Sequence, residues 1–297
     1  MSYNIEELSK IYSVSGQRFE DYKKEALLTI TSGKKPDKEK TLIIVGGQSG
    51  SGKSRVIPLA KEELHNNVVI VDFDELRALH PNYEDVNNNY SEVAHRILHP
   101  DTERVKNEVL KEVIRQGLNV IYEGALRNTQ GFLDFAKDFR EAGYKIKMYI
   151  MAVPKLESYG STFTRYALAH INNTQPRWVE KSAHDGSYEG VPKTVKAFIE
   201  AGMVDDIHVF VRDKERPRRI YTTEGKQFED PLTAIEYGRV SGRRQAIIDF
   251  GMKYQTTRHI LSEKEPDKVD KLEDWLLLYE QELRDLQKLN FQGNEKE

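Results

Sequence analysis

Short continuous runs of hydrophobic residues alternate with longer segments of helical periodicity along most of the chain. The hydrophobic runs are TLIIVGG (41–47), NVVIVD (67–72), LNVIYEG (118–124), KIKMYIMAV (145–153) and DIHVFVRD (206–213). A short apolar run of this kind is typical of a parallel strand that is buried on both faces. Segments of helical character lie between them, at 55–65, 102–116, 131–142 and 156–202. This alternation predicts an α/β fold with a parallel sheet flanked by helices.

The two ends of the chain lie outside this alternation, and both are predicted to be helical extensions. Residues 1–30 carry apolar positions at helical spacing, and residues 31–40 form a polar connector that contains glycine and proline. Residues 218–230 predict a hairpin or loop, after which the pattern is helical again. We therefore expect an N-terminal helical segment with a linker (1–40), a core (41–230) and a C-terminal helical extension (231–297).

The C-terminal extension contains a heptad-like seam of apolar residues. These residues recur at intervals of three and four, at Val269, Leu272, Leu276, Tyr279, Leu283 and Leu286. Such a seam packs either against the helix's own domain or against a second helix in a coiled coil. The spacing alone is compatible with both arrangements.

Charge and composition exclude several classes of protein. The formal net charge is −3, from 45 Lys+Arg and 48 Asp+Glu, which argues against a dedicated nucleic-acid binder. The absence of cysteine excludes disulfides, a thiolate nucleophile and Cys-ligated zinc or iron–sulfur sites. No apolar stretch approaches the roughly 20 residues of a transmembrane helix, and the N-terminus lacks the pattern of a secretory signal. We therefore expect a cytoplasmic protein that does not associate with a membrane.

A phosphate-binding loop follows the first predicted strand. Its residues, which fit the pattern G-x-x-x-x-G-K-[ST], are Gly47, Gln48, Ser49, Gly50, Ser51, Gly52, Lys53 and Ser54. Glycines allow the backbone N–H groups to approach phosphate oxygens closely, and the following helix adds the positive end of its dipole. Lys53 is expected to reach the β- and γ-phosphates, and the Ser54 hydroxyl to bind Mg²⁺. The predicted cofactors are therefore ATP and Mg²⁺.

Acidic residues follow two of the other predicted strands. Asp72 and Asp74 come after residues 67–71, and Glu123 ends the run at 118–124. In open α/β sheets the ligand lies beyond the carboxyl ends of the strands, so these carboxylates are candidate catalytic or acceptor-binding groups. Asp74 has two interpretations, a general base that deprotonates a hydroxyl or an N-cap of the following helix. Glu123 favours a functional role, because an unpaired carboxylate at the end of a buried strand is costly.

Arginines are expected around the transferred phosphate, since phosphoryl transfer depends on charge neutralisation. The candidates are Arg127, Arg165 and Arg177. His95 and His99 are four residues apart and could share one face of a helix. They do not form the H-E-x-x-H pattern of a zinc site, because Arg96 occupies the position of its glutamate.

Several segments together resemble the zeta toxin family, which consists of P-loop kinases of bacterial toxin–antitoxin systems. The segments are GGQSGSGKS, VDFDELRALHPNY, VIYEGALRNT, MYIMAVPKLESYGSTFTRYA and PRWVEKSAHD, and they occur in order within residues 10–215. The resemblance implies that ATP phosphorylates UDP-N-acetylglucosamine or a related nucleotide sugar, which blocks the supply of cell-wall precursors. It also implies a small helical antitoxin protein as a partner.

The resemblance further implies roles for individual residues. Lys53 matches the P-loop lysine, and Asp74 matches the catalytic aspartate that also contacts the substrate. The substrate-binding acid and arginine match Glu123 and Arg127, and the phosphate-contacting arginines match Arg165 and Arg177. This sequence departs from the family pattern at Ala125, where the family has a threonine after the glycine.

Two other functions remain open at this stage. One is a P-loop kinase that acts on a different small-molecule hydroxyl acceptor. The other is an NTPase switch or binding module, which the absence of an obvious switch glutamine and the acid-rich strand ends disfavour. An ATPase activity stimulated by a metabolite would indicate a kinase, and stimulation by a protein partner would indicate a switch.

Overall fold

The computed structural model describes residues 3–91, 93–172, 174, 176–225 and 227–294, with side chains through residue 288. The chain divides into two compact units. The first unit comprises Met1–Ile44, Ile57–Glu123 and Ala136–Ile146, and the second comprises Val45–Val56, Gly124–Phe135 and Lys147–Glu297. Among the described residues, no helix combines the length and apolar character needed to span a membrane.

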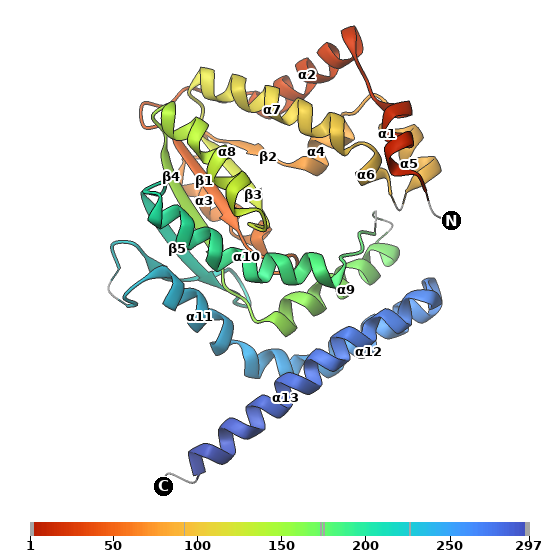
Figure 1. The fold of residues 1–297 in the computed structure, drawn as a ribbon, viewed down its shortest axis with the longest axis vertical. Helices are drawn as coiled ribbons and strands as arrows, with labels where there is room; N and C mark the ends of the chain where they lie inside the picture. Colours follow the sequence, from red (N-terminus) through yellow and green to blue (C-terminus); the bar gives the residue numbers. More distant parts are fainter. Residues whose placement is uncertain (1–2, 92, 173, 175, 226, 295–297) are drawn as a thin grey trace. The chain divides into compact units, whose positions relative to one another are not determined.

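The central sheet has six strands in the order β2-β3-β1-β4-β5-β6 (Figure 1). The strands are β1 (Thr41–Gly46), β2 (Val69–Val71), β3 (Val120–Gly124), β4 (Lys145–Met151), β5 (Asp206–Val211) and β6 (Arg218–Thr222). β2 pairs with β3 and β4 pairs with β5 in parallel, whereas β6 is antiparallel to β5. The predicted α/β fold with a largely parallel sheet is confirmed. The segment expected to be a hairpin or loop supplies the edge strand β6, which pairs antiparallel with the preceding strand β5 as in a hairpin and buries Ile220 and Tyr221.

The first unit contains most of the N-terminal helices. They are α1 (Ile5–Tyr12), α2 (Gly16–Thr31), α3 (Ile57–Glu63), α4 (Phe73–Ala78), α5 (Tyr83–Tyr90), α6 (Ala94–Ile97) and α7 (His99–Gln116). The sequence pattern did not predict α5 or α6, because each helix is too short to show a clear hydrophobic periodicity. They are stabilised by packing instead, since Val86, Ala94 and Ile97 are buried together against Ile5 and Leu8 of α1.

The second unit contains the helices that follow β4. They are α9 (Lys155–Ile171), α10 (Lys181–Glu200), α11 (Pro231–Ser241), α12 (Arg243–Lys264) and α13 (Glu273–Asn294), with a 3-10 segment at Pro266–Leu272. The remaining helix, α8 (Thr129–Glu141), contributes residues to both units. The helical pattern at 156–202 therefore corresponds to two helices, and the linker between them carries Arg177.

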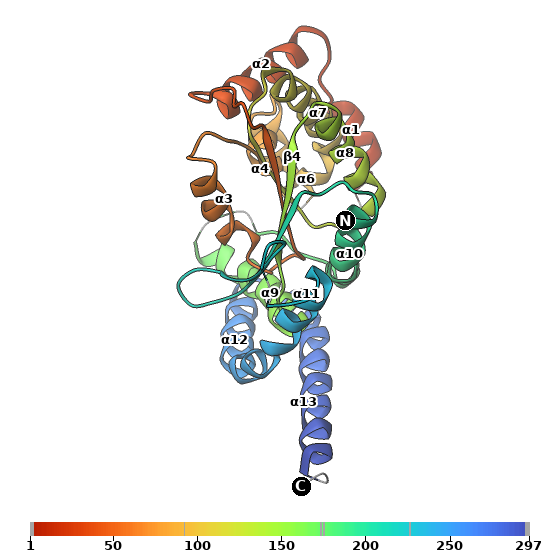
Figure 2. The same cartoon turned by 90° about the vertical axis from the view of Figure 1, so that its left-hand side faces the viewer.

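The C-terminal helices pack on α9 through a large aromatic cluster. Trp275 is 2% exposed and stacks on Phe163 of α9, and Phe250 of α12 stacks on Tyr279 of α13 with ring centroids 4.0 Å apart. Within the heptad-like seam, Leu272 is fully buried and Tyr279 belongs to this cluster, so this part of the seam lies against its own unit. The last turns of α13 extend past α12, as Figures 1 and 2 both show.

Candidate nucleotide and acceptor site

The glycine-rich loop lies between β1 and a short 3-10 turn at Lys53–Arg55, which precedes α3. Gly50 and Gly52 have φ angles of 74° and 88°, a left-handed conformation that favours glycine. The Lys53 ammonium donates to the Gln48 carbonyl at 3.1 Å, which folds the lysine back over the loop. The Ser51 hydroxyl is buried without a hydrogen-bond partner among the described residues, so the loop retains an unused polar group. These features fit a cradle for phosphate oxygens.

The loop is supported from one side by α9. Gln48 is fully buried, and its side-chain amide donates to the Val153 carbonyl at 3.0 Å and to the Ser158 hydroxyl at 3.1 Å. A Cβ atom on Gly50 would lie only 2.0 Å from the Ser158 carbonyl oxygen. Gly50 therefore has to be glycine for two reasons, the left-handed backbone and this close approach.

The support continues from Ser158 into α10. The Ser158 hydroxyl is 3.0 Å from Nε2 of His184, which is fully buried. Burial lowers the pKa of His184 to about 4, so the ring is neutral at pH 7. Asp185 pairs with Lys155 at 2.8 Å and with Lys181 at 2.7 Å. Burial acts to raise the pKa of Asp185, but these two ammonium groups outweigh it and hold the pKa at about 2.

The predicted arginines all lie in the second unit and are exposed. Arg165 is on α9, and Arg177 is in the linker before α10, next to Trp178. The Trp178 ring packs edge-on against Phe163 and Tyr166 of α9, which anchors this linker.

Arg127 lies in the loop after β3, and α10 determines the conformation of that loop. Leu126 has a left-handed backbone with φ of 51°, and its carbonyl accepts a hydrogen bond from Thr194 of α10 at 2.9 Å. A Cβ atom on Gly186 would lie 3.2 Å from Cδ of Arg127, so the arginine side chain runs along α10. This position is therefore set by residues that are distant in sequence.

The acidic residues form an edge of the first unit. β2 and β3 pair in the register Val71↔Tyr122, so Asp72 and Glu123, the next residue of each strand, are neighbours at the carboxyl ends. Both side chains belong to exposed residues. The structure thus brings the two acidic segments together.

The N-cap interpretation of Asp74 is wrong. The N-cap of α4 is Asp72, whose side chain accepts a hydrogen bond from the Asp74 N–H at 2.8 Å. Asp74 lies in the first turn of α4, where its side chain is 62% exposed and 2.5 Å from the Arg77 guanidinium. Its carboxylate is therefore not needed to cap the helix and is accessible for chemistry.

Sequence reasoning missed Lys106, which lies behind this acidic edge. The residue is 7% exposed, and its ammonium pairs with Glu103 at 2.6 Å and lies over the rings of Phe73 and Tyr122. Burial raises the pKa of the Tyr122 hydroxyl to about 12, so this group stays protonated. The sequence does contain a sign of this buried lysine, because Lys106 occupies a position on the apolar face of α7, between Val105 and Val109.

His95 and His99 do not share a helix face. His95 is in α6 and His99 begins α7, where its ring packs against Phe73 with centroids 6.0 Å apart. The chain ends one helix at Ile97 and starts the next two residues later, so their four-residue spacing is not helical. Within the described part of the chain, no group of three His, Cys, Asp or Glu residues could hold a metal ion.

Known proteins resemble this chain in both sequence and fold. Toxin zeta of Streptococcus pyogenes is 27% identical over 264 residues, which covers 82% of this chain and 91% of that protein. Toxin PezT of Streptococcus pneumoniae is 28% identical over 189 residues, covering 63% and 75% respectively. A structure from the PezAT toxin–antitoxin system of S. pneumoniae aligns with a TM-score of 0.72 and 24% identity, covering 85% of this chain and 98% of that one.

A more distant structure is the AvrRxo1-ORF1:-ORF2 complex solved with ATP, which aligns with a TM-score of 0.51 and 12% identity over 78% of this chain and 71% of that one. These structural likenesses show a common P-loop kinase-like fold. The model of the Zeta toxin family matches residues 24–226. Since this match covers more than half of the chain, the protein belongs to the zeta toxin family.

Proposed function

We propose that this protein is a cytoplasmic toxin of a toxin–antitoxin system that phosphorylates UDP-N-acetylglucosamine, within a catalytic part spanning residues 41–230. ATP supplies the phosphoryl group that is transferred. The observation that carries the proposal is the glycine-rich loop, in which Lys53 and the left-handed Gly50 and Gly52 form a phosphate cradle. The AvrRxo1-ORF1:-ORF2 complex, which shares the fold, was solved with ATP, and this supports nucleotide binding by the present chain.

The residues of the cradle bind and neutralise phosphate. Lys53 would place its ammonium on the β- and γ-phosphates, and the Ser54 hydroxyl would be a ligand of Mg²⁺. Mg²⁺ commonly keeps several water ligands and binds through one or two carboxylates and substrate phosphates, so the Ser54 hydroxyl would be one of several ligands of this ion. Arg165 and Arg177 would neutralise the charge that develops during transfer.

The acidic edge would bind and activate the acceptor. Asp74 would accept the proton of the attacking hydroxyl, which its exposed carboxylate allows because Asp72 caps the helix. Glu123 would accept hydrogen bonds from the sugar hydroxyls, and Arg127 would contact the diphosphate. Ala125 lacks the hydroxyl that the family carries next to this glutamate, so the acceptor's affinity is the property most sensitive to this position.

The decisive experiment incubates the full chain with ATP and Mg²⁺ and a panel of nucleotide sugars. We expect a product from UDP-N-acetylglucosamine whose mass is higher by one phosphoryl group. The Lys53→Ala variant should give none, whereas Lys137→Ala, which removes a lysine that is 68% exposed on α8, should be as active as wild type. Product from a different acceptor would replace the proposed substrate, and ATP hydrolysis stimulated only by a protein would indicate a switch.

A growth experiment tests the proposal that the protein is a toxin. Expression of the chain alone in bacteria should halt growth with cell-wall defects, and the Lys53→Ala form should be tolerated. Equal toxicity of both forms would show that the effect is not catalytic. The similarity to a structure from the PezAT toxin–antitoxin system supports an antitoxin as partner, and co-expression of such a partner should restore growth.

A further inference from the structure

We propose that Arg212 is a positioning residue of the nucleotide site, which holds the glycine-rich loop in its phosphate-binding shape from outside the loop. This inference rests on the nucleotide-binding part of the proposed function and not on the identity of the acceptor. Arg212 directly follows β5 and is 162 residues from its loop partner, Gly50.

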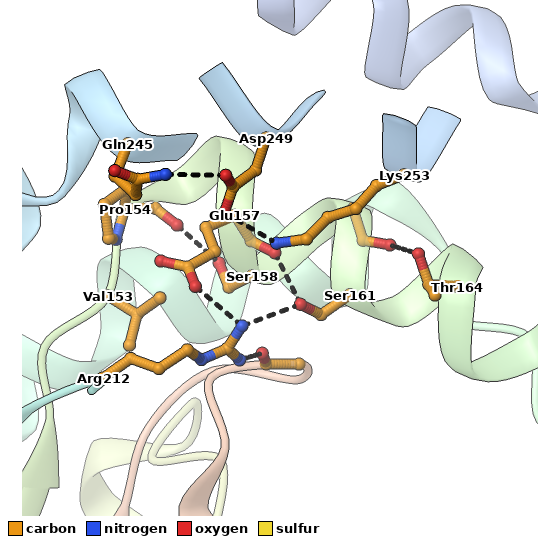
Figure 3. Close-up of polar contacts among 12 residues, drawn as sticks. Val153, Pro154, Glu157, Ser158, Ser161, Thr164, Arg212, Gln245, Asp249 and Lys253 are labelled. Atoms are coloured by element: carbon orange, nitrogen blue, oxygen red, sulfur yellow. Dashed lines mark hydrogen bonds and ion pairs between the residues drawn. The ribbon is translucent and has the colours of Figure 1, made fainter. Parts of the chain in front are cut away.

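The Arg212 guanidinium joins the loop to α9, as Figure 3 shows. Its Nη2 donates to the Gly50 carbonyl at 2.5 Å, and its Nη1 donates to Oε1 of Glu157 at 2.8 Å and to the Ser161 hydroxyl at 3.1 Å. The side chains of Arg212 and Glu157 are only 23% and 16% exposed. A charge-assisted bond that is partly shielded from water is stronger and less mobile than a surface ion pair.

The contact with Gly50 matters because a phosphate cradle has to present donors. A backbone carbonyl that faced the phosphate would repel it, since both carry negative charge on oxygen. The guanidinium gives the Gly50 carbonyl a cationic partner of its own and so fixes the orientation of this peptide group. Gly50 has a left-handed φ of 74°, and a Cβ atom at this position would lie 2.0 Å from the Ser158 carbonyl oxygen, so this peptide group is held between α9 and the Arg212 guanidinium.

A second arginine, Arg55, connects the glycine-rich loop to the segment after β5 from the side of the loop. Arg55, in the turn after the loop, donates to the carbonyls of Asp213, Lys214 and Glu215 at distances of 2.8 to 3.0 Å. The loop and the segment after β5 are therefore connected in both directions, and Arg212 is the member that reaches the glycines themselves.

The residues of α9 that Arg212 contacts lie on the same face of this helix as Arg165. Glu157, Ser161 and Arg165 are spaced four residues apart on α9, so they lie along one stripe of the helix. By binding Glu157 and Ser161, Arg212 fixes the rotation of this stripe relative to the loop. The loop and a predicted phosphate-contacting arginine thus share one support.

The test compares nucleotide affinity in Arg212→Gln and Arg212→Lys with wild type, using calorimetric titration of the full chain with ATP and with ADP. We expect both variants to raise the Kd for ATP and for ADP by about 10- to 100-fold, because one charge-assisted contact is worth this much. Lysine should not restore affinity, since one ammonium cannot replace the two-nitrogen bridge. ADP should be affected as strongly as ATP, because the backbone of the loop cradles the inner phosphates.

The matched control is Arg243→Gln, which removes an ion pair with Glu282 of similar length and burial on α12 and α13. It should lower the melting temperature and leave both Kd values within twofold. Glu157→Gln retains the Gly50 contact and should weaken nucleotide binding only a few-fold, which provides a second reading if Arg212→Gln does not fold. Unchanged Kd values in a folded Arg212 variant, or an equal loss in Arg243→Gln, would overturn the inference.

Binding of ATP and ADP does not require the acceptor, so this test is separate from the identity of the substrate. A wild-type chain that binds nucleotide but does not phosphorylate UDP-N-acetylglucosamine would refute the proposed substrate and leave the role of Arg212 to be decided by the Kd values. A wild-type chain that binds neither nucleotide would overturn the inference itself.

Discussion

Replacing Asp101 by asparagine should destabilise the first unit, because this carboxylate collects donors from several segments. Asp101 is 3% exposed and accepts hydrogen bonds from the Val14 N–H at 2.7 Å, Ser13 at 3.2 Å and Arg104 at 2.8 Å, with His80 at 3.4 Å. The bonds from Ser13 and Val14 tie the junction of α1 and α2 to α7. The amide side chain of the variant would offer one acceptor oxygen and turn an N–H donor toward groups that are themselves donors.

The expected decrease in the free energy of unfolding follows from the ionisation of Asp101. Burial acts to raise its pKa, but the hydrogen bonds from His80, Val14, Arg104 and Ser13 outweigh it and hold the pKa at about 2, against 3.8 ordinarily. This difference corresponds to about 2 to 3 kcal/mol at pH 7 in favour of the folded, ionised form. We therefore expect Asp101→Asn to lower the free energy of unfolding by about 2 to 3 kcal/mol at pH 7.

The loss should depend on pH in a defined direction. A pKa that is lowered by folding contributes stability above the unfolded pKa, and this contribution disappears as the pH falls through the folded pKa. The difference between wild type and Asp101→Asn should therefore be constant from about pH 5 to 8, about half as large near pH 3, and close to zero near pH 2. This difference in the free energy of unfolding can be measured by urea unfolding at several pH values, monitored by circular dichroism.

The matched control is Glu112→Gln, also on α7. Its carboxylate likewise has a pKa of about 2, mainly through its hydrogen bond with Arg115, but that pair lies on the surface of one helix. An exposed pair of this kind contributes little to stability, so the variant should unfold almost like wild type. A small loss in Asp101→Asn, or a loss that does not shrink in acid, would refute the reasoning.

Four further variants test individual features. Asp74→Asn should reduce kcat by about 10²- to 10⁴-fold without changing the melting temperature, whereas Asp72→Ala should cost about 1 kcal/mol of stability because it removes a helix cap. Gly160→Ala should lower the melting temperature and shift the tryptophan fluorescence, since its Cβ would lie 2.2 to 2.5 Å from the Trp275 ring. Ala125→Thr should change the KM for the nucleotide sugar and leave the KM for ATP unaltered, as steady-state kinetics would show.

The strands and the glycine-rich loop could be predicted because their signals are local. A buried strand needs a short apolar run, and β1 is buried at every position. The motif fixes glycine at positions 47 and 52, and Gly52 has a left-handed φ of 88°, whereas the left-handed Gly50 occupies a position that the motif leaves open. Both signals are contained in a few consecutive residues, so no tertiary contact is needed to recognise them.

The role of Asp74 stayed open between cap and base in the sequence because two neighbouring aspartates can cap the same helix. Asp72 and Asp74 are both good capping residues, and the choice depends on where β2 ends. The strand stops at Val71, so the extended backbone of Asp72 precedes the first turn and its carboxylate reaches the Asp74 N–H. Strand ends are set by pairing with β3, which the sequence of β2 alone does not contain.

The residues that support the glycine-rich loop could not be predicted from the sequence for a similar reason. Gln48 is part of the recognised motif, but its partners are Ser158, 110 residues away, and through it His184. Arg212 follows an ordinary β-strand run and contacts a backbone carbonyl group, which every residue possesses. Because any residue type can supply a backbone carbonyl, the sequence does not show which residue Arg212 contacts. No motif or spacing could therefore predict this hydrogen bond.

Helix α9 shows how a segment that resembles a catalytic motif can be largely structural. Ser158 supports the glycine-rich loop directly and Glu157 supports it through Arg212, and Gly160 leaves room for the Trp275 ring. Within the segment LESYGSTFTRYA only Arg165 is proposed to touch the nucleotide. The C-terminal helices therefore act on the helix that holds both the loop and this arginine, and substitutions in their interface with α9 should weaken ATP binding as well as stability.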